Sequence, residues 1–302
     1  MLRKSRLFVV VFFIISLAIF VVFHIVRIAT TDRSVPVIEM DNNSVTVSVE
    51  GGDAAILQGV TATDKKDGDI TENLFIESRT AFLERGRFEV TIAAADKDNH
   101  VAKVTREVIY SDYISPQFSL AGPLKFLTSR ESQDDLNITN GLSAKDVIDG
   151  NISNKIKISS DYSISSFTPG DYHMIFLVTN SMGDTAKLPV TITIYTASQE
   201  SGLPQIILSK YLINTPKGKQ IDLSTLVEQI NYRNSTFIRG EDGNYYNGDF
   251  NSEGEAVMFP ADSIKIDSDI DWNSPGAYEV TFKFMDTSTE LSNFVRCYIV
   301  VY

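Results

Sequence analysis

Cysteine, histidine and tryptophan are scarce in this sequence. Its 302 residues include one cysteine, one tryptophan and three histidines. A single thiol cannot form a disulfide bond within the chain, so a fold held together by disulfides is excluded. The three histidines, His24, His100 and His173, leave few side chains for catalysis by imidazole groups.

Motifs of common enzymes are missing as well. The chain lacks the G-x-S-x-G nucleophile elbow, the H-E-x-x-H zinc motif and the phosphate-binding G-x-x-x-x-G-K-S/T loop. Glycoside hydrolysis needs two carboxylates set across a cleft, whereas the acid pairs of this chain recur at turn positions. Cys297 lies inside an expected strand, where we expect it to be packed. We therefore predict that the protein is not an enzyme.

Positive charge is also in short supply. The chain has 27 basic and 39 acidic residues, a net charge of −12. Four of the basic residues (Arg3, Lys4, Arg6 and Arg27) lie in or beside an N-terminal apolar run, so the remainder is more acidic still. An acidic surface repels the phosphate backbone, and we expect no nucleic-acid partner.

The apolar run is long enough to cross a membrane. Residues 7–26 contain only Ser16 and His24 as polar members, and a helix of this length spans the ~30 Å hydrocarbon core. Basic residues precede the run, which favours a cytoplasmic N-terminus. A cleaved signal peptide is the alternative, but the run is long and a weak cleavage site follows it. We predict a cytoplasmic tail (1–6), an uncleaved signal anchor in the cell membrane (7–28) and extracellular C-terminal domains.

Internal similarity organises the rest of the chain. The segments GVTATDKKDGDIT (59–71) and GLSAKDVIDGNIS (141–153) share glycine, aspartate and isoleucine at matching positions. A glycine-led segment then occurs three times, at 86–96, 170–180 and 276–286. Each copy has an aromatic residue two positions after the glycine and ends in aspartate or asparagine. Three similar units are therefore predicted.

These units have the pattern of β-strands. Side chains alternate between apolar and polar in FEVTIAAA and YEVTFKFM, and many residues are β-branched or aromatic. Short strands in units of about 90 residues are typical of antiparallel sandwiches. We predict an all-β ectodomain of three tandem β-sandwiches after one N-terminal transmembrane helix. Its parts are a linker (29–35), domain 1 (36–111), domain 2 (112–197) and domain 3 (198–302), the last with an insertion in 205–271 whose fold we leave open.

The order of motifs resembles a known family. D-x-x-D-G-D-I-T, then G-x-Y/F-x-V-T, then a closing aspartate is similar to the bacterial immunoglobulin-like repeats of cell-surface proteins, which look like hyaline-repeat domains. The first unit matches over 63–108, and the second departs at Asn151 and Asn180. The third matches from Pro275 onward. The resemblance implies immunoglobulin-like sandwiches used as stalks, adhesins or carbohydrate-associated accessory domains, and it does not imply catalysis.

Four aspartates of the first unit form the densest acidic group: Asp64, Asp67, Asp69 and Asp96. Calcium takes six to eight oxygen ligands, which acidic loops can supply. Alternatively, aspartates accept hydrogen bonds from backbone N–H groups in the turns that they begin. The second unit has asparagine at two of the four positions, which favours the turn interpretation. No cofactor is required by the sequence, and a calcium site is the alternative.

The segment RGEDGNYYNGDF (239–250) is the most suggestive for binding. Two turn dipeptides bracket Tyr245 and Tyr246. Exposed aromatic rings stack on the apolar face of a sugar, and neighbouring polar groups bind its hydroxyls. A long hairpin with its tyrosines folded over the sandwich is the alternative. The candidate binding residues are Asp242, Asn244, Tyr245, Tyr246, Asn247 and Asp249.

Together these features predict a membrane-anchored extracellular surface protein. Its expected role is adhesion to, or recognition of, a protein or polysaccharide partner. The alternative is a structural stalk or scaffold subunit of a membrane-bound cell-envelope assembly. A third hypothesis is an accessory to an enzyme encoded elsewhere.

Overall fold

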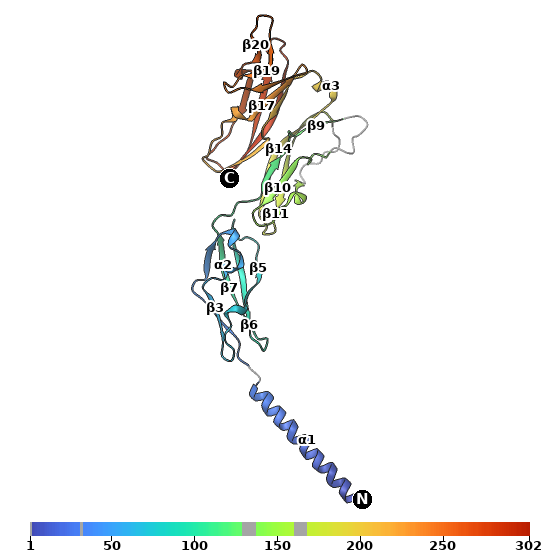
Figure 1. The fold of residues 1–302 in the computed structure, drawn as a ribbon, viewed down its shortest axis with the longest axis vertical. Helices are drawn as coiled ribbons and strands as arrows, with labels where there is room; N and C mark the ends of the chain where they lie inside the picture. Colours follow the sequence, from blue (N-terminus) through green and yellow to red (C-terminus); the bar gives the residue numbers. More distant parts are fainter. Residues whose placement is uncertain (1, 31–32, 129–136, 160–167) are drawn as a thin grey trace. The chain divides into compact units, whose positions relative to one another are not determined.

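The computed structural model describes residues 2–30, 33–128, 137–159 and 168–302, which form one long N-terminal helix followed mainly by β-strands (Figure 1). Helix α1 spans Leu2–Thr30. Its segment Arg6–Arg27 is long and apolar enough to cross a membrane. The helix thus includes most of the predicted tail and the first part of the predicted linker 29–35. Residues 31 and 32 of that linker lie outside the described residues.

The chain divides into two compact units, residues 1–113 and 114–302. The first unit contains α1 and predicted domain 1. The second unit contains predicted domains 2 and 3 together. We call predicted domains 1, 2 and 3 the first, second and third repeat from here on, and keep "unit" for the two compact parts. The predicted boundary at 197/198 falls in a short helix inside this second unit, α3 (Ala197–Glu200).

After α1, the first unit has two sheets. A three-stranded sheet has the order β1-β3-β4, and a four-stranded sheet has the order β2-β7-β6-β5. Only the pairing of β2 with β7 is parallel among these strands. The strands are β1 (Val37–Met40), β2 (Ser44–Val47), β3 (Val60–Asp64), β4 (Gly68–Asp69), β5 (Leu74–Arg79), β6 (Arg87–Ala95) and β7 (Val101–Tyr110), with short helices η1 (Val49–Gly51), α2 (Gly52–Ile56) and η2 (Thr71–Asn73).

The first half of the second unit repeats this arrangement. Its sheets have the orders β11-β10-β8 and β12-β13-β14-β9, and β9 is parallel to β14. The strands are β8 (Gln117–Leu120), β9 (Lys125–Leu127), β10 (Leu142–Asp146), β11 (Gly150–Asn151), β12 (Lys157–Ile158), β13 (Gly170–Thr179) and β14 (Thr185–Tyr195), with short helix η3 (Ser153–Lys155).

The second half of the second unit has a similar four-stranded sheet, but its other sheet differs from the three-stranded sheets described above. The order β16-β23-β22-β21 matches the earlier four-stranded sheets, but a five-stranded sheet, β15-β17-β18-β19-β20, takes the place of the three-stranded sheet. The strands are β15 (Gln205–Leu208), β16 (Leu212–Thr215), β17 (Val227–Tyr232), β18 (Ser235–Arg239), β19 (Tyr245–Phe250), β20 (Ala256–Phe259), β21 (Ile264–Ser268), β22 (Gly276–Met285) and β23 (Ser292–Val301), with η4 (Leu223–Leu226) and η5 (Ala261–Ser263).

The threefold pattern of the sequence is thus present in the strand order. The glycine-led segments form the long strands β6, β13 and β22, each paired with the next long strand of its repeat. The paired Asp-Gly motifs form tight turns, in which Gly68 and Gly150 have φ angles of 76° and 70°. This left-handed conformation is easy for glycine and costly for residues with a Cβ atom. The predicted insertion in 205–271 supplies the strands that enlarge the third repeat.

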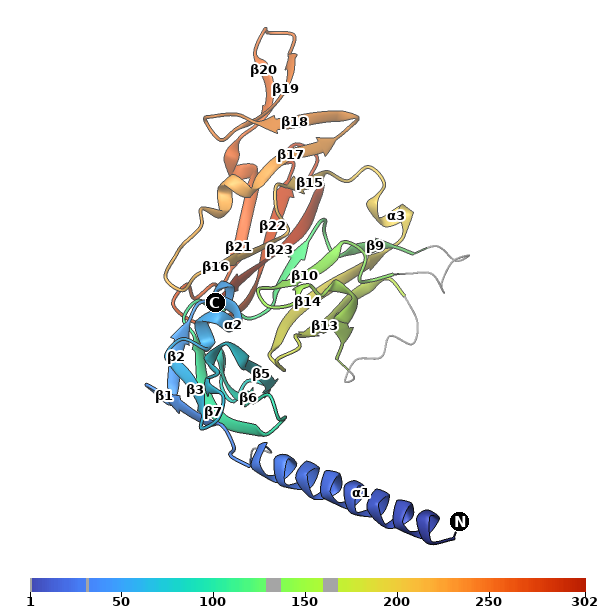
Figure 2. The same cartoon turned by 60° about the horizontal axis from the view of Figure 1, so that its bottom comes forward.

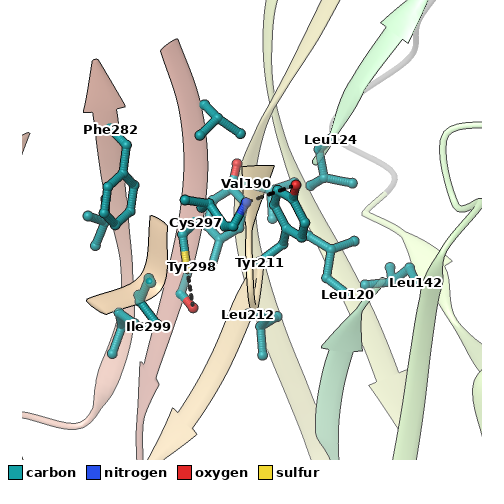
Figure 3. Packing of buried hydrophobic residues seen from close by; sticks show 14 of the residues in the cluster. Leu120, Leu124, Leu142, Val190, Tyr211, Leu212, Phe282, Cys297, Tyr298 and Ile299 are labelled. Carbon is teal, nitrogen blue, oxygen red and sulfur yellow. Dashed lines mark hydrogen bonds between the residues drawn. The ribbon is translucent and has the colours of Figure 1, made fainter. Parts of the chain in front are cut away.

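The two repeats of the second unit share one hydrophobic core (Figure 3). Leu120 and Val190 from the second repeat and Phe282 and Ile299 from the third belong to the same buried cluster. Cys297 lies in this core with no exposed surface, as its position in an alternating strand predicted. The core therefore joins the repeats into one body.

Polar contacts reinforce this junction. The Tyr298 hydroxyl donates to the backbone oxygen of Thr191 (2.9 Å) and accepts from its N–H (3.0 Å). At the edge of the junction, Arg296 donates to Asp171 (2.6 Å) and to Thr193 (2.6 Å). Tyr298 is only 1% exposed, so water cannot replace its two hydrogen bonds.

We predict that Tyr298→Phe lowers the free energy of unfolding by about 1–3 kcal/mol, because Thr191 loses both partners of its backbone groups. Urea unfolding of the purified protein measures this change. Tyr278→Phe is the control, since its hydroxyl makes one partly buried hydrogen bond to the backbone oxygen of Ser274. Equal losses in both variants would contradict the prediction.

Candidate functional site

The five-stranded sheet presents one face to the core and the other outward. Ile206, Ile230 and Phe237 lie opposite one another on β15, β17 and β18, and all three are buried. Side chains alternate between the two faces of a sheet, so the residues next to them in each strand lie on the outward face. Figure 2 shows the β19–β20 hairpin extending beyond the other strands of this sheet.

An apolar row crosses the outward face. Ile238 of β18 lies opposite Tyr246 of β19, which lies opposite Met258 of β20. Ile238 is 60% exposed and Met258 is 45% exposed, while Tyr246 is half-buried. We call Ile238, Tyr246 and Met258 the apolar row.

A polar row lies beside it on the same face. Gln205, Asn231 and Thr236 are opposite one another on β15, β17 and β18, two positions along the strands from the apolar row. The Thr236 hydroxyl donates to Oδ1 of Asn231 (3.0 Å), and Nε2 of Gln229 donates to the same oxygen (3.4 Å). We call Gln205, Asn231 and Thr236 the polar row. The outward face therefore places amide and hydroxyl groups next to exposed apolar side chains.

Tyr246 is held in a fixed position on this face. Its hydroxyl donates to Oδ2 of Asp242 (2.6 Å), which also accepts from Nδ2 of Asn244 (2.8 Å). The hydrogen bond from Tyr246 is the main cause of a lowered pKa of Asp242. A Cβ atom on Gly240 would lie 3.1 Å from the tyrosine ring, so the glycine allows the ring to pack on the backbone. The ring is thus pre-positioned for contact.

The structure separates the two tyrosines that the sequence paired. Tyr245 is 2% exposed and lies opposite Phe259 on the inward face, and burial raises its pKa. The expectation of an exposed ring is therefore wrong for Tyr245, because neighbouring strand residues point to opposite faces. Asn247 and Asp249 bind each other within β19, through Nδ2 of Asn247 and Oδ2 of Asp249 (2.7 Å).

Of the residues in the apolar row and the polar row, only Tyr246 was among the candidates from the sequence. The alternation of Gln229, Asn231, Thr236 and Ile238 with buried residues is visible in the sequence. It becomes informative only when the partner strands and their register are known.

The acidic residues of the first unit lie at turns. Oδ1 of Asp64 accepts from the backbone N–H groups of Lys66 (2.7 Å) and Asp67 (3.0 Å). The hydrogen bond from Asp67 is the largest cause that lowers the pKa of Asp64 to about 2. Oδ1 of Asp96 accepts from the N–H groups of Asp98 and His100 in the same way.

The other two candidates accept backbone hydrogen bonds as well. Oδ2 of Asp67 accepts from the N–H of Lys97 (3.0 Å), and Oδ1 of Asp69 accepts from the N–H of Thr71 (2.9 Å). Within the residues that the structure describes, no group of three or more acidic, histidine or cysteine side chains is arranged to hold a metal ion. The backbone hydrogen bonds to these carboxylates favour the turn interpretation.

The second repeat makes the same turn with less charge. Oδ1 of Asp146 accepts from the N–H groups of Ile148 and Asp149 (2.9 Å each). Asn180, which replaces Asp96, accepts two backbone hydrogen bonds through Oδ1 and donates to Oδ2 of Asp146 (3.1 Å). An amide can thus perform the turn role of the carboxylate.

Comparison with known proteins gives limited matches. No protein-family model matches the chain. An uncharacterized 81.3 kDa protein of Acholeplasma phage L2 is 27% identical over 126 residues, which are 41% of this chain. The chain spans 16% of the length of this relative.

Several solved structures share some likeness with this chain. The CBM51-2 and INT domains of a Clostridium perfringens protein, in complex with GlcNAc, are 20% identical over 48% of this chain and 29% of that one, with a TM-score of 0.21. A protocadherin gamma B4 extracellular domain is 16% identical over 90% and 50% of the chains (TM-score 0.19). A Bacteroides thetaiotaomicron lipoprotein is 13% identical over 61% and 98% (TM-score 0.22).

Acid is expected to destabilise the protein between about pH 4 and pH 2. Asp64 has a folded-state pKa of about 2, below the ordinary value of an aspartate, so its contribution to stability is present above pH 4 and is lost as the pH falls toward 2. The melting temperature of the Asp64→Asn variant should fall less than that of the parent protein over this pH range. Thermal unfolding followed by circular dichroism measures the melting temperature at each pH. The control variant is Glu72→Gln, because Glu72 is an exposed acid of the same unit. Identical pH profiles for parent and Asp64→Asn would contradict the prediction.

We also expect millimolar calcium to leave the melting temperature unchanged, because each of the four candidate carboxylates already accepts a backbone hydrogen bond that holds it in place. Thermal unfolding with calcium and with a chelator measures the effect. A calcium-dependent rise that Asp67→Asn removes would instead establish a metal site.

Proposed function

We propose that this protein is a membrane-anchored surface protein that recognises a partner through the outward face of its five-stranded sheet. The observation that carries the proposal is the apolar row. Ile238, Tyr246 and Met258 lie in one row, and Tyr246 and Met258 are on the two strands, β19 and β20, by which this sheet exceeds the three-stranded sheets of the other repeats. Added strands with an exposed apolar surface are a common basis of interaction sites.

The geometry of the row supports recognition by a rigid surface. The hydrogen bond from Tyr246 to Asp242 fixes the ring before any partner arrives. A fixed side chain loses little conformational entropy on binding, which favours affinity. The inward face of the same sheet is anchored in the core by Ile230 and Phe237.

The proposed location follows from the N-terminal helix. Arg6–Arg27 has the length and composition of a membrane span, and basic residues precede it. By the positive-inside rule the N-terminus is cytoplasmic and the β-units are extracellular. In this proposal the protein is non-catalytic and its partner is a protein or a polysaccharide.

A scaffold or stalk role is the second candidate. The shared core of the second and third repeats favours it, because two repeats joined by buried contacts resist bending. A scaffold needs no free ligand, so the two functions differ in whether the purified protein binds anything through the apolar row.

The test is co-sedimentation of the full chain, held in lipid nanodiscs, with cell-wall material and insoluble polysaccharides. We expect binding that the double variant Ile238→Ser, Met258→Ser weakens at least about tenfold, because two exposed apolar side chains lose their contact area. The control is Phe75→Ser, Val101→Ser, two apolar side chains of similar exposure in the first unit. Equal losses in both double variants, or no binding by the parent, would leave the scaffold role as the better account.

A further inference from the structure

A polar cleft lies at the end of the polar row. Its volume is about 510 Å³, and it is bounded by the start of β15, the turn between β17 and β18, and the segment that follows α3. Gln205, Asn231 and Thr236 of the polar row all line it. The volume is within the range of about 300–1,000 Å³ that is usual for small-molecule sites.

The turn that forms one wall has an unusual residue. Arg233 and Asn234 join β17 to β18, and both have positive φ angles, 50° and 61°. Two-residue turns of this kind favour glycine and asparagine, and arginine is a costly choice at the first position. The turn geometry alone therefore does not explain Arg233.

Arg233 lines the cleft, and two neighbouring side chains hold its guanidinium. Its guanidinium lies over the ring of Tyr232, with 5.0 Å between Cζ and the ring centroid, and one nitrogen is 3.9 Å from Oδ2 of Asp286. The side chain remains 61% exposed and lines the cleft. It can therefore donate to a ligand while the stacked ring limits its motion.

The remaining groups are mainly neutral donors and acceptors. Oδ1 of Asn231 already accepts two hydrogen bonds, which leaves its amide nitrogen as a donor. Asn234 and Ser235 add another amide and another hydroxyl. The one acid of the lining, Glu200, is paired with Lys125 and accepts from Asn293, so its charge is neutralised.

We infer that this cleft binds a sugar unit of an oligosaccharide. Amides, hydroxyls and one guanidinium match the alternating donors and acceptors of sugar hydroxyls. The apolar row begins two positions along the strands, where Tyr246 and Ile238 offer contact to the C–H face of a following sugar. The net charge of −12 disfavours a polyanion such as a nucleic acid.

The inference rests on the proposed function, since it names the ligand class for the same face. A protein partner would also use the apolar row, but it would not need the cleft. Variants in the cleft and variants in the row therefore separate the two ideas.

The experiment is titration calorimetry of the full chain in nanodiscs with soluble oligomers of glucose, galactose and N-acetylglucosamine. We expect at least one of them to bind, and Arg233→Gly and Asn231→Ala each to weaken that binding at least tenfold. Arg233→Gly should keep or raise the melting temperature, because glycine suits the turn. Loss of binding without loss of stability is the signature of a ligand contact.

The matched control is Asn99→Gly, which makes the same kind of change at another left-handed position (φ 69°), in the first unit. Its affinity should equal that of the parent. Unchanged affinity in both cleft variants would overturn the assignment of the cleft. If no oligosaccharide binds while the apolar-row variant still loses co-sedimentation with cell-wall material, the inference fails and the proposed function stands. If the parent binds in neither assay, both fail.

Discussion

The buried hydrogen bonds between Tyr298 and Thr191 determine how the second unit is built. They lie in a core that the second and third repeats share, so neither repeat can turn without exposing apolar side chains and unpaired backbone groups. The five-stranded sheet rests on the same core through Ile230 and Phe237. The outward face is therefore presented by a rigid support rather than by a loop.

The sequence was informative wherever local chemistry decides the structure. An Asp-Gly pair at the end of an alternating segment makes a turn whatever surrounds it, and Asp64 and Asp146 form the same hydrogen bonds in two repeats. The glycine-led segments likewise become long paired strands, because alternation over ten residues has few other interpretations. The apolar N-terminal run forms a helix because about 20 consecutive, mostly apolar residues are typical of a helix.

The candidate site was harder to predict, because it depends on partners distant in sequence. Tyr245 and Tyr246 are equivalent by composition, and only the register with β18 and β20 places one inside and one outside. Ile238 and Met258 lie on either side of Tyr246 on one face, although 19 residues separate them in the chain. The shared core could not be predicted for the same reason. Thr191 and Tyr298 come from two repeats whose sequence similarity suggested independent domains.

The single thiol has a practical consequence. Cys297 has no exposed surface, and burial raises its pKa to about 12, so at neutral pH it is a protonated group that reagents cannot reach. A cysteine introduced at an exposed position would then be the only reactive thiol of the folded chain. Spectroscopic probes can be attached at chosen exposed sites without first replacing the native residue, and the movement of the labelled strand becomes measurable.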